Sequence, residues 1–362
     1  MFSPQDHMYM ARAIRLAERG LYTTDPNPRV GCVLVKGGRI VGEGWHEVAG
    51  GPHAEVAALR DAGEAARGAT AYVTLEPCCH HGRTPPCTAA LREAGAARVV
   101  AAMEDPNPLM RGKGLAACKA AGMVVDSGLC RDRAEALNPG YSLRMREGRP
   151  LVRCKMAMTL DGRTATAGGE SQWITGEAAR RDVQRLRARS SAVMTGIGTV
   201  LDDDPAMNVR IDTPRQPLRV ITDSRLRTPP QARILAKPGE ALIYCADAPD
   251  EKRLALEEQG AAVVCLSSRG RVDLKSVLAD LAARQVNELL LEAGATLAGA
   301  MVRAGLVDEL VVYMAPRLLG SAGRGLLNLE GIDRLAQAVE LDIRDIRAVG
   351  DDWRFTAILR PA

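Results

Sequence analysis

The chain has 362 residues, which at about 150 residues per domain indicates two domains, each large enough to bury its own core. Hydrophobic residues make up 46% of the chain and charged residues 25%, a composition typical of globular proteins that excludes wholesale disorder and fibrous repeats. The net charge of +4 is divided as +2 on each side of Gly148 and only 3% of residues are aromatic, which argues against nucleic-acid binding and favours a small, phosphorylated ligand.

The first half of the chain predicts a helix, a hairpin and then an alternating series of helices and strands. Residues 1–20 read as a helix with an imperfect apolar stripe formed by Met8, Ala11, Leu16 and Ala17. A hairpin follows, with strands over 30–36 and 39–43 joined by a Gly-Gly turn. Helices over 52–62, 86–94 and 112–121 then alternate with strands over 70–75, 98–102 and 124–126. This order predicts a three-layer α/β domain.

The second half begins after a helix predicted over 131–146. A charged stretch broken by glycine and proline over 144–150 marks the boundary, which gives domains 1–148 and 149–362. Beyond it we expect strands over 151–158, 192–195, 219–222, 241–245, 263–266, 288–292 and 309–314. Helices fall between several of them, for example over 177–189, 273–283 and 297–304. The second domain is therefore also predicted to be α/β.

The cysteine content indicates a reducing compartment. The nine cysteines are an odd number in a long chain, and the N-terminus shows no basic segment followed by an apolar one. No run of about 18 apolar residues that could span a bilayer occurs. We therefore expect a cytoplasmic protein without membrane partners, in which cysteines are core residues or metal ligands.

Two segments of the first half suggest a metal site. His53 and Cys78 each follow a proline at what we predict to be a helix start, where a proline costs no hydrogen bond and the helix dipole favours a thiolate. Together with Cys87 they offer one imidazole and two thiolates, a donor set suited to zinc. Three protein ligands leave a fourth position for water, which zinc acidifies from a pKa of about 15.7 to near 7.

Glu55 lies two residues after His53, so the two side chains occupy different faces of the predicted helix. Its carboxylate is the expected proton shuttle, taking a proton from water and delivering it to a leaving nitrogen. Taken singly, each of these residues is more often structural. Their order along the chain is that of zinc nucleobase deaminases, although eight residues separate the cysteines where two are usual.

The whole chain resembles a known family, the bifunctional deaminase–reductases of riboflavin biosynthesis (the RibD family). The resemblance is carried by the motifs PNPRVGCV (26–33), HAE (53–55), TLEPCCHHGRTPPC (74–87), LDGRT (160–164), SQWIT (171–175), DDP (203–205) and EAG (292–294). This family has the long spacing between the two cysteines and usually carries serine at the position of Cys79. The resemblance implies a cytidine-deaminase-like first domain and a dihydrofolate-reductase-like second domain.

The resemblance also implies two reactions on a phosphorylated pyrimidine. In the first, 2,5-diamino-6-ribosylamino-4(3H)-pyrimidinone 5′-phosphate loses its 2-amino group by hydrolysis. In the second, NADPH reduces the ribosyl group to ribityl, giving 5-amino-6-ribitylaminouracil 5′-phosphate. Asn27, His80 and Arg83 match motif positions near the first substrate, although Asn27 is as well explained as a turn residue.

The second half has no Gly-x-Gly-x-x-Gly fingerprint, so the expected contacts there rest on the resemblance. Substrate contacts are expected at Ser171, Arg187, Met207, Arg210 and Glu292, the two arginines being suited to phosphate. Asp161 has an equally good reading as a turn residue, and its role stays open. The expected cofactor contacts are Ala157, Trp173, Thr199, Asp203, Ser224, Gly294, Ala295, Thr296, Leu297, Ala298, Gly299 and Ala300.

Two rival interpretations remain to be tested. One is a deaminase of RNA or free cytidine with an unrelated C-terminal domain, which the charge balance and few aromatics disfavour. The other is a regulator that binds zinc and nucleotides without catalysis, which Glu55 disfavours because a structural zinc site needs no proton shuttle. Whether the chain forms a homo-oligomer cannot be read from the sequence.

Overall fold

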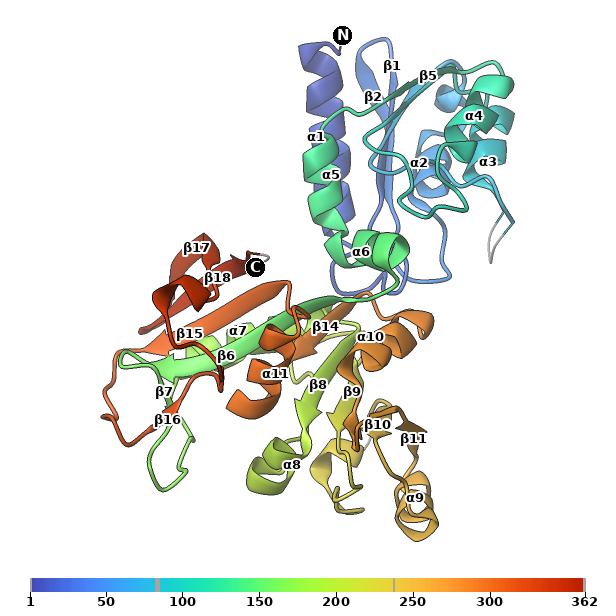
Figure 1. Ribbon diagram of the computed structural model, residues 1–362. Helices are drawn as coiled ribbons and strands as arrows, with labels where there is room; N and C mark the ends of the chain where they lie inside the picture. Colours follow the sequence, from blue (N-terminus) through green and yellow to red (C-terminus); the bar gives the residue numbers. More distant parts are fainter. Residues whose placement is uncertain (1, 82–84, 237, 361–362) are drawn as a thin grey trace. The chain divides into compact units, whose positions relative to one another are not determined.

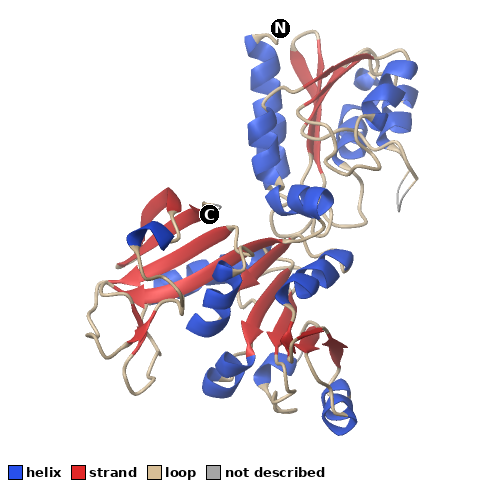
Figure 2. Cartoon of the chain, viewed as in Figure 1, coloured by secondary structure: helices blue, strands red, loops and turns tan. Residues whose placement is uncertain are grey.

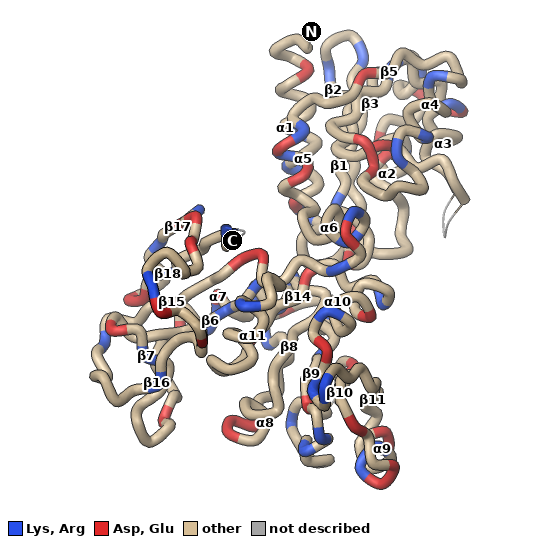
Figure 3. The backbone as a smooth tube through the Cα atoms, viewed as in Figure 1, with Lys and Arg blue, Asp and Glu red and all other residues tan. Residues whose placement is uncertain are grey.

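The computed structural model describes residues 2–81, 85–236 and 238–360. The chain forms two compact units, Met1–Arg149 and Pro150–Ala362, each built on its own sheet (Figure 1). Acidic and basic residues are interspersed along both units (Figure 3). Within the described ranges, no helix has the length and apolar character that a membrane crossing requires.

The first unit contains a five-stranded sheet in the order β2-β1-β3-β4-β5. The hairpin strands pair antiparallel, and β1 also pairs antiparallel with β3, whereas β3, β4 and β5 run parallel. The strands are β1 (Gly31–Lys36), β2 (Arg39–Trp45), β3 (Thr70–Val73), β4 (Arg98–Ala101) and β5 (Val124–Ser127). All five lie where the sequence predicted strands.

Helices cover both faces of this sheet (Figure 2). One apolar cluster joins the sheet to α1 (Pro4–Glu18) and α5 (Arg131–Leu137). A second cluster, on the opposite face, joins it to α2 (Ala54–Ala62), α3 (Cys87–Glu93) and α4 (Lys113–Ala120). The predicted three-layer α/β arrangement is confirmed.

The predicted apolar stripe of α1 is wrong in part. Met8 is 56% exposed, and the buried face is formed instead by Tyr9, Met10, Ala13, Ile14, Leu16 and Ala17. The helix begins with a capping box, in which the Ser3 hydroxyl accepts from the N–H of Asp6 and the Asp6 carboxylate accepts from the N–H of Ser3. This start orients the helix so that Met8 faces solvent.

The single helix predicted over 131–146 is in fact two, α5 and α6 (Pro139–Glu147), which are separated at Asn138. A residue before proline is disfavoured in the helical region, and Asn138 adopts φ −128° and ψ 49°. Its amide exchanges two hydrogen bonds of 2.8 Å with the backbone of Arg29. The break therefore ties this helical segment to the residues that precede β1.

The second unit contains a nine-stranded sheet in the order β11-β10-β9-β8-β14-β6-β15-β18-β17. The strands from β11 to β15 pair in parallel, whereas β18 pairs antiparallel with both of its neighbours, β15 and β17. Two small two-stranded sheets pair β7 with β16 and β12 with β13. The strands are β6 (Leu151–Thr159), β7 (Arg163–Ala165), β8 (Ala192–Gly196), β9 (Leu218–Thr222), β10 (Ala241–Cys245), β11 (Ala261–Cys265), β12 (Ser267–Ser268), β13 (Arg271–Val272), β14 (Glu288–Leu291), β15 (Glu309–Ala315), β16 (Arg324–Gly325), β17 (Leu341–Val349) and β18 (Asp352–Leu359).

Helices again pack on both faces of the large sheet. The apolar cluster on one face includes side chains of α10 (Leu274–Ala283) and α11 (Ala295–Arg303). The cluster on the other face includes side chains of α7 (Glu177–Arg189), α8 (Ile197–Asp203) and α9 (Asp250–Glu257). The sequence predicted the α/β class and the seven longer strands from β6 to β15, and it missed α8, α9, the short strands and the hairpin of β17 and β18.

Candidate functional site

His53 is placed at the first unit's site by the start of α2, where it is the N-cap residue in extended conformation (φ −73°, ψ 161°). Its side chain makes no capping hydrogen bond, so the ring is turned toward neighbouring segments instead. Helix α2 lies directly against β2, because a Cβ atom on Gly44 would stand 2.4 Å from the backbone nitrogen of Ala58. Only glycine at this position permits that approach.

Cys78 and Cys87 are held together by hydrogen bonds at the start of α3. The prediction that Cys78 begins a helix is wrong. Cys78 does not begin a helix; it lies in an irregular segment after β3, and Cys87 is the residue that begins α3. The N–H of Cys87 donates to the Sγ atom of Cys78 at 3.3 Å, and the N–H of Thr88 donates to the Cys78 carbonyl oxygen at 3.2 Å. The N-terminus of α3 therefore favours the Cys78 thiolate, although Cys78 itself is not part of that helix.

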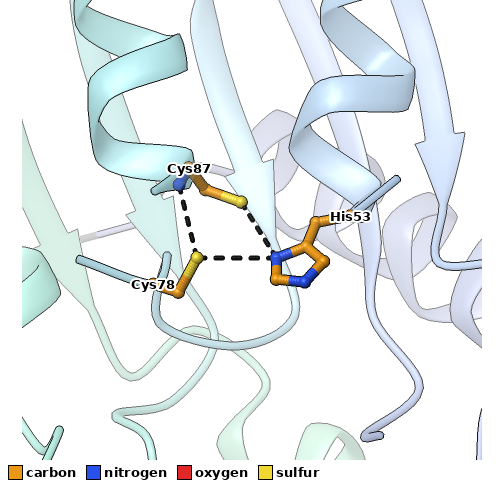
Figure 4. Close-up of side chains that lie close together, drawn as sticks. All are labelled: His53, Cys78 and Cys87. Carbon is orange, nitrogen blue, oxygen red and sulfur yellow. Dashed lines mark hydrogen bonds between the residues drawn. The ribbon is translucent and has the colours of Figure 1, made fainter. Parts of the chain in front are cut away.

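The three predicted ligands converge (Figure 4). The Nδ1 atom of His53 lies 3.2 Å from the Sγ atom of Cys87 and 3.5 Å from the Sγ atom of Cys78. One donor atom from each of the three residues lies within 4.8 Å of the others. One imidazole nitrogen and two sulfurs at this spacing fit zinc and leave room for a fourth ligand.

The segment that carries Cys78 is anchored by the buried carboxylate of Glu76. Its two oxygens accept from four backbone N–H groups at 2.7–3.2 Å, those of Asp105, Gly112, Gly114 and Leu115. The last two belong to the first turn of α4, so the carboxylate fastens that helix to the metal-binding segment. Charge-assisted bonds of this kind are the stronger ones in proteins, which makes Glu76 a firm support for Cys78.

In the metal-free chain the pKa values of the two thiols are shifted in opposite directions. A hydrogen bond from Cys87 lowers the pKa of Cys78 to about 4, and the same bond together with burial raises the pKa of Cys87. The hydrogen bond with Cys78 also raises the pKa of His53. A divalent cation would displace the thiol proton and hold both sulfurs as thiolates.

Glu55 is buried beside the sulfurs, with only 3% of its surface exposed. Burial, followed by the negative charge of Cys78, raises the pKa of its carboxyl to about 7. A carboxyl that titrates near neutral pH can both accept and release a proton at little cost. The role of Glu55 as a proton shuttle stays a prediction.

Asn27 reaches the metal-binding segment through His46, a histidine that no motif in the sequence singles out. The His46 Nδ1–H donates to the carbonyl oxygen of Pro52 at 2.9 Å, so His46 Nε2 accepts from the amide of Asn27 at 3.0 Å. The rings of His46 and His53 meet edge to face with centroids 5.4 Å apart. His80 is exposed near Cys78, and Arg83 lies outside the described residues.

In the second unit the expected cofactor residues gather where parallel strands end. Ser224 follows β9, Thr199 lies in α8 directly after β8, and Gly294 caps α11 after β14. These three strands are neighbours in the sheet, and ligands of open α/β sheets bind outside such carboxyl ends. The buried Oγ1 of Thr195, near the end of β8, lacks a hydrogen-bond partner among the described residues. The expected contacts from Ala295 to Ala300 form the first turns of α11, while Ala157 lies within β6.

Three of the expected substrate residues, Arg187, Met207 and Glu292, form one buried cluster. The Arg187 guanidinium binds the Glu292 carboxylate at 2.6 and 3.0 Å and also contacts the Met207 sulfur at 3.6 Å. Arg210 is exposed and contributes positive charge that helps to lower the pKa of Glu292. Lys155, a residue of β6 that the sequence did not single out, has its Nζ atom 4.0 Å from a carboxylate oxygen of Glu292. Burial lowers the pKa of Lys155. The one feature of the sequence that could have indicated Lys155 is its place as a lysine within a mostly apolar strand.

A loop after β7 carries the remaining expected contacts. Ser171 and Trp173 lie in it, and the amide of Gln172 donates to Asp203 at the end of α8 at 3.2 Å. The Arg180 guanidinium stacks over the Trp173 ring at 4.8 Å. Asp161 has a different role, since its carboxylate accepts from the N–H groups of Leu319 and Gly320. That contact supports the turn interpretation of Asp161.

Comparison with known proteins supports the resemblance of both halves of the chain to the RibD family. The family model described as the cytidine and deoxycytidylate deaminase zinc-binding region matches residues 3–103, and the RibD C-terminal domain matches residues 150–355. The riboflavin biosynthesis protein RibD of Escherichia coli (strain K12) is 52% identical over 361 residues, covering 96% of this chain and 98% of the relative. The chain belongs to the RibD family.

Other RibD proteins extend this match. The Haemophilus influenzae RibD is 47% identical and covers 98% of both chains. The structure of Acinetobacter baumannii RibD, form 1, is 46% identical with a TM-score of 0.92 and covers 99% of both chains. A Thermotoga maritima structure, described as a diaminohydroxyphosphoribosylaminopyrimidine deaminase and 5-amino-6-(5-phosphoribosylamino)uracil reductase, is 30% identical with a TM-score of 0.86, covering 98% of this chain and 99% of that one.

Membership in the RibD family settles the general activity. The chain is a bifunctional deaminase and reductase of riboflavin biosynthesis, with zinc and NADPH as its cofactors. The match of a RibD reductase domain to residues 150–355 excludes the rival with an unrelated C-terminal domain. The rival regulator without catalysis is excluded by the same membership.

Proposed function

We propose that the first unit deaminates 2,5-diamino-6-ribosylamino-4(3H)-pyrimidinone 5′-phosphate and that the second reduces the product to 5-amino-6-ribitylaminouracil 5′-phosphate. The Thermotoga maritima relative is named for a phosphoribosylaminopyrimidine and a phosphoribosylaminouracil, which supports this choice of substrates. The observation that carries the deamination is the convergence of His53, Cys78 and Cys87 beside the buried Glu55.

In the deamination, His53, Cys78 and Cys87 hold the zinc ion. When bound, zinc supplies a hydroxide nucleophile at neutral pH. The Glu55 carboxylate takes the proton from the attacking water and then delivers it to the departing 2-amino nitrogen, so that ammonia leaves.

Other residues of the first unit orient the pyrimidine. The His46 ring fixes the amide of Asn27 with its NH2 group toward His46, which directs the carbonyl oxygen of Asn27 the opposite way. That oxygen is an acceptor suited to an N–H group of the pyrimidine. His80 and Arg83 are proposed to contact the ring or the phosphate.

In the reduction, the carboxyl ends of β8, β9 and β14 hold NADPH, which supplies hydride to C1′ of the sugar. Ser224, Thr199 and the N-terminal turn of α11 are the proposed contacts, together with Ala157, Trp173 and Asp203. The backbone N–H groups at the start of α11 suit a phosphate. Ser171, Met207, Arg210 and the pair of Arg187 and Glu292 line the proposed substrate side.

The finer organisation is also a proposal. The boundary between the activities is placed at residue 148, close to the division between Arg149 and Pro150. We place the enzyme in the cytoplasm, where the thiolate ligands stay reduced. A second copy of the chain is the proposed partner of the hairpin of β17 and β18, which exposes the large apolar side chains of Leu341, Ile343, Ile346, Trp353 and Ile358.

The experiment that tests this function combines three measurements on one preparation. Metal analysis should give one zinc per chain, and the pyrimidine phosphate should release ammonia without NADPH. Oxidation of NADPH should begin only after deamination, or at once with substrate that has already been deaminated. Ammonia release that is unchanged after zinc removal would refute the deaminase assignment.

A further inference from the structure

Cys245 and Cys265 form a pair of thiols away from the zinc ligands. They are the last residues of the neighbouring parallel strands β10 and β11 and are direct partners in the register. Their Sγ atoms lie 2.9 Å apart. Directly paired positions on adjacent strands have a Cα separation within the range that a disulfide bridges, so no rearrangement of the sheet is needed to join them.

The two thiols differ in environment. Cys245 is fully buried, and burial, followed by its contacts with Cys265 and nearby acidic groups, raises the pKa of its thiol to about 12. Cys265 is exposed. An oxidant therefore reaches Cys265 first and finds Cys245 beside it, the arrangement of an exposed thiol with a resolving partner.

Segments that follow the two strands are hydrogen-bonded to Ser224. The Ser224 carbonyl oxygen accepts from the N–H groups of Ala246 and Asp247 at 3.2 Å, directly after Cys245. The Ser224 Oγ accepts from the N–H of Val272 at 3.2 Å, in the segment that follows Cys265. The N–H of Leu266 donates to the Cys245 carbonyl oxygen at 2.9 Å and joins the two segments. A displacement of either cysteine would therefore reach Ser224 through the hydrogen bonds to its carbonyl oxygen and to its Oγ.

We propose that Cys245 and Cys265 are a reversible redox pair, and that their disulfide weakens NADPH binding through the neighbouring Ser224. A disulfide imposes a fixed torsion on the two side chains, which the strand ends and the segment 266–272 must accommodate. Disulfides in cytoplasmic proteins are typically transient and redox-sensing. The effect on NADPH rests on the proposed contact of Ser224 with the cofactor, whereas the disulfide itself does not.

A peroxide is the proposed oxidant. The Cys265 thiolate attacks one peroxide oxygen, the O–O bond breaks, and Cys265 becomes a sulfenic acid as one water leaves. The Cys245 sulfur then attacks the Cys265 sulfur, the S–O bond breaks, and the hydroxide leaves as a second water with the Cys245 proton. Two thiols and one hydrogen peroxide thus give one disulfide and two waters, and a dithiol such as dithiothreitol reverses the change.

The first test is chemical and uses the full-length, zinc-loaded enzyme. After treatment with hydrogen peroxide and blocking of free thiols, peptide mapping by mass spectrometry should find a peptide that links Cys245 to Cys265 and that dithiothreitol removes. Cys265→Ser should not form it, whereas the control Cys130→Ser, which changes a partly buried cysteine of the other unit, should form it normally. Absence of the linked peptide in the wild-type enzyme would overturn the proposal.

The second test is kinetic and uses substrate that has already been deaminated. Oxidation should raise the KM for NADPH at least about threefold with kcat little changed, a change that Cys265→Ser should abolish. Retained ammonia release would show that peroxide has spared the zinc site. If the linked peptide forms and the KM for NADPH is unchanged, the proposed link to the cofactor is wrong. Ser224→Ala tests the cofactor contact separately. If this substitution does not alter the KM for NADPH, the role of Ser224 is refuted, whereas the proposed disulfide is not affected.

Discussion

Arg187 and Glu292 form a bidentate ion pair, with N–O distances of 2.6 and 3.0 Å, inside the second unit. Their side chains are only 11% and 8% exposed, so each charge depends on the other. Burial alone would raise the pKa of Glu292, but the Arg187 guanidinium holds it below its ordinary value. The two residues therefore form one neutral unit rather than a free cation and a free anion.

Arg187→Ala should destabilise the protein by about 3–5 kcal/mol, because it leaves the Glu292 carboxylate buried without its partner. Denaturant unfolding of the second unit measures this loss. Arg185→Ala is the matched control, since Arg185 lies on the same helix with a 67% exposed side chain and an ion pair worth less than about 1 kcal/mol. Equal losses in the two variants would contradict the importance of the pair.

Glu55→Gln should retain zinc and lose ammonia release by about 10²–10⁴-fold, because the amide is nearly the same shape but cannot carry a proton. Metal content and ammonia release are measured on the same sample. NADPH oxidation with deaminated substrate serves as the internal control and should be unchanged. A variant with full deaminase activity would remove Glu55 from the mechanism.

The metal-free enzyme should become less stable relative to Glu55→Gln as the pH rises from about 5 to 7. Folding raises the pKa of Glu55 from 4.5 to about 7, so the folded state binds an additional proton in this range, and its stability falls when the proton is lost. The relative change should be on the order of 3 kcal/mol at most, from about 1.4 kcal/mol for each pKa unit. Parallel urea titrations of the two proteins at several pH values measure it, and a constant difference would argue against a raised pKa.

Cys78→Ser should reduce zinc content strongly, whereas Cys79→Ser should leave it close to one ion per chain. The two substitutions remove neighbouring sulfurs, but only Cys78 has its sulfur beside Nδ1 of His53. Cys79 lies outside the group of converging donor atoms in the part of the chain that the structure describes. Metal analysis after gel filtration distinguishes them, and zinc loss from Cys79→Ser would mean that the site uses a different sulfur.

A fragment of residues 150–362 should reduce substrate that has already been deaminated. Its sheet, its two apolar clusters and all the proposed reductase contacts lie within that unit. Circular dichroism and cooperative unfolding would first establish that the fragment folds. Loss of NADPH oxidation in a folded fragment would show that the first unit contributes to the reductase.

Local patterns in the sequence predicted most of the fold, and long-range contacts account for the errors. The Gly-Gly turn defines the hairpin of β1 and β2, and the buried strands are short apolar runs. Asn138 breaks the predicted helix over 131–146 because it precedes a proline and binds the backbone of Arg29, a partner far away in sequence. The hairpin of β17 and β18 lacks a regular buried alternation, since β17 is mostly exposed and β18 is mostly buried or half-buried, so no period in the sequence indicated these strands.

The site shows the same division. The motif residues His53, Glu55, Cys78 and Cys87 could be selected from their types and order, and the structure brings them together. What the sequence could not show is how they are supported. Glu76 binds backbone N–H groups of a distant segment, and His46 joins the carbonyl of Pro52 to the side-chain amide of Asn27. Such contacts produce no periodic pattern in the sequence. Lys155 becomes notable only once Glu292 lies beside it.

The contact between α4 and the metal-binding segment limits how this site could be transplanted. A Cβ atom on Gly114 would stand 1.9 Å from the carbonyl oxygen of Pro77, so the two backbones touch with no side chain between them. Gly114 therefore cannot be replaced by any larger residue unless one of the two backbones moves, although the glycine binds neither metal nor pyrimidine. A designer who grafted the three ligands onto another scaffold would have to carry this distant helix start along with them.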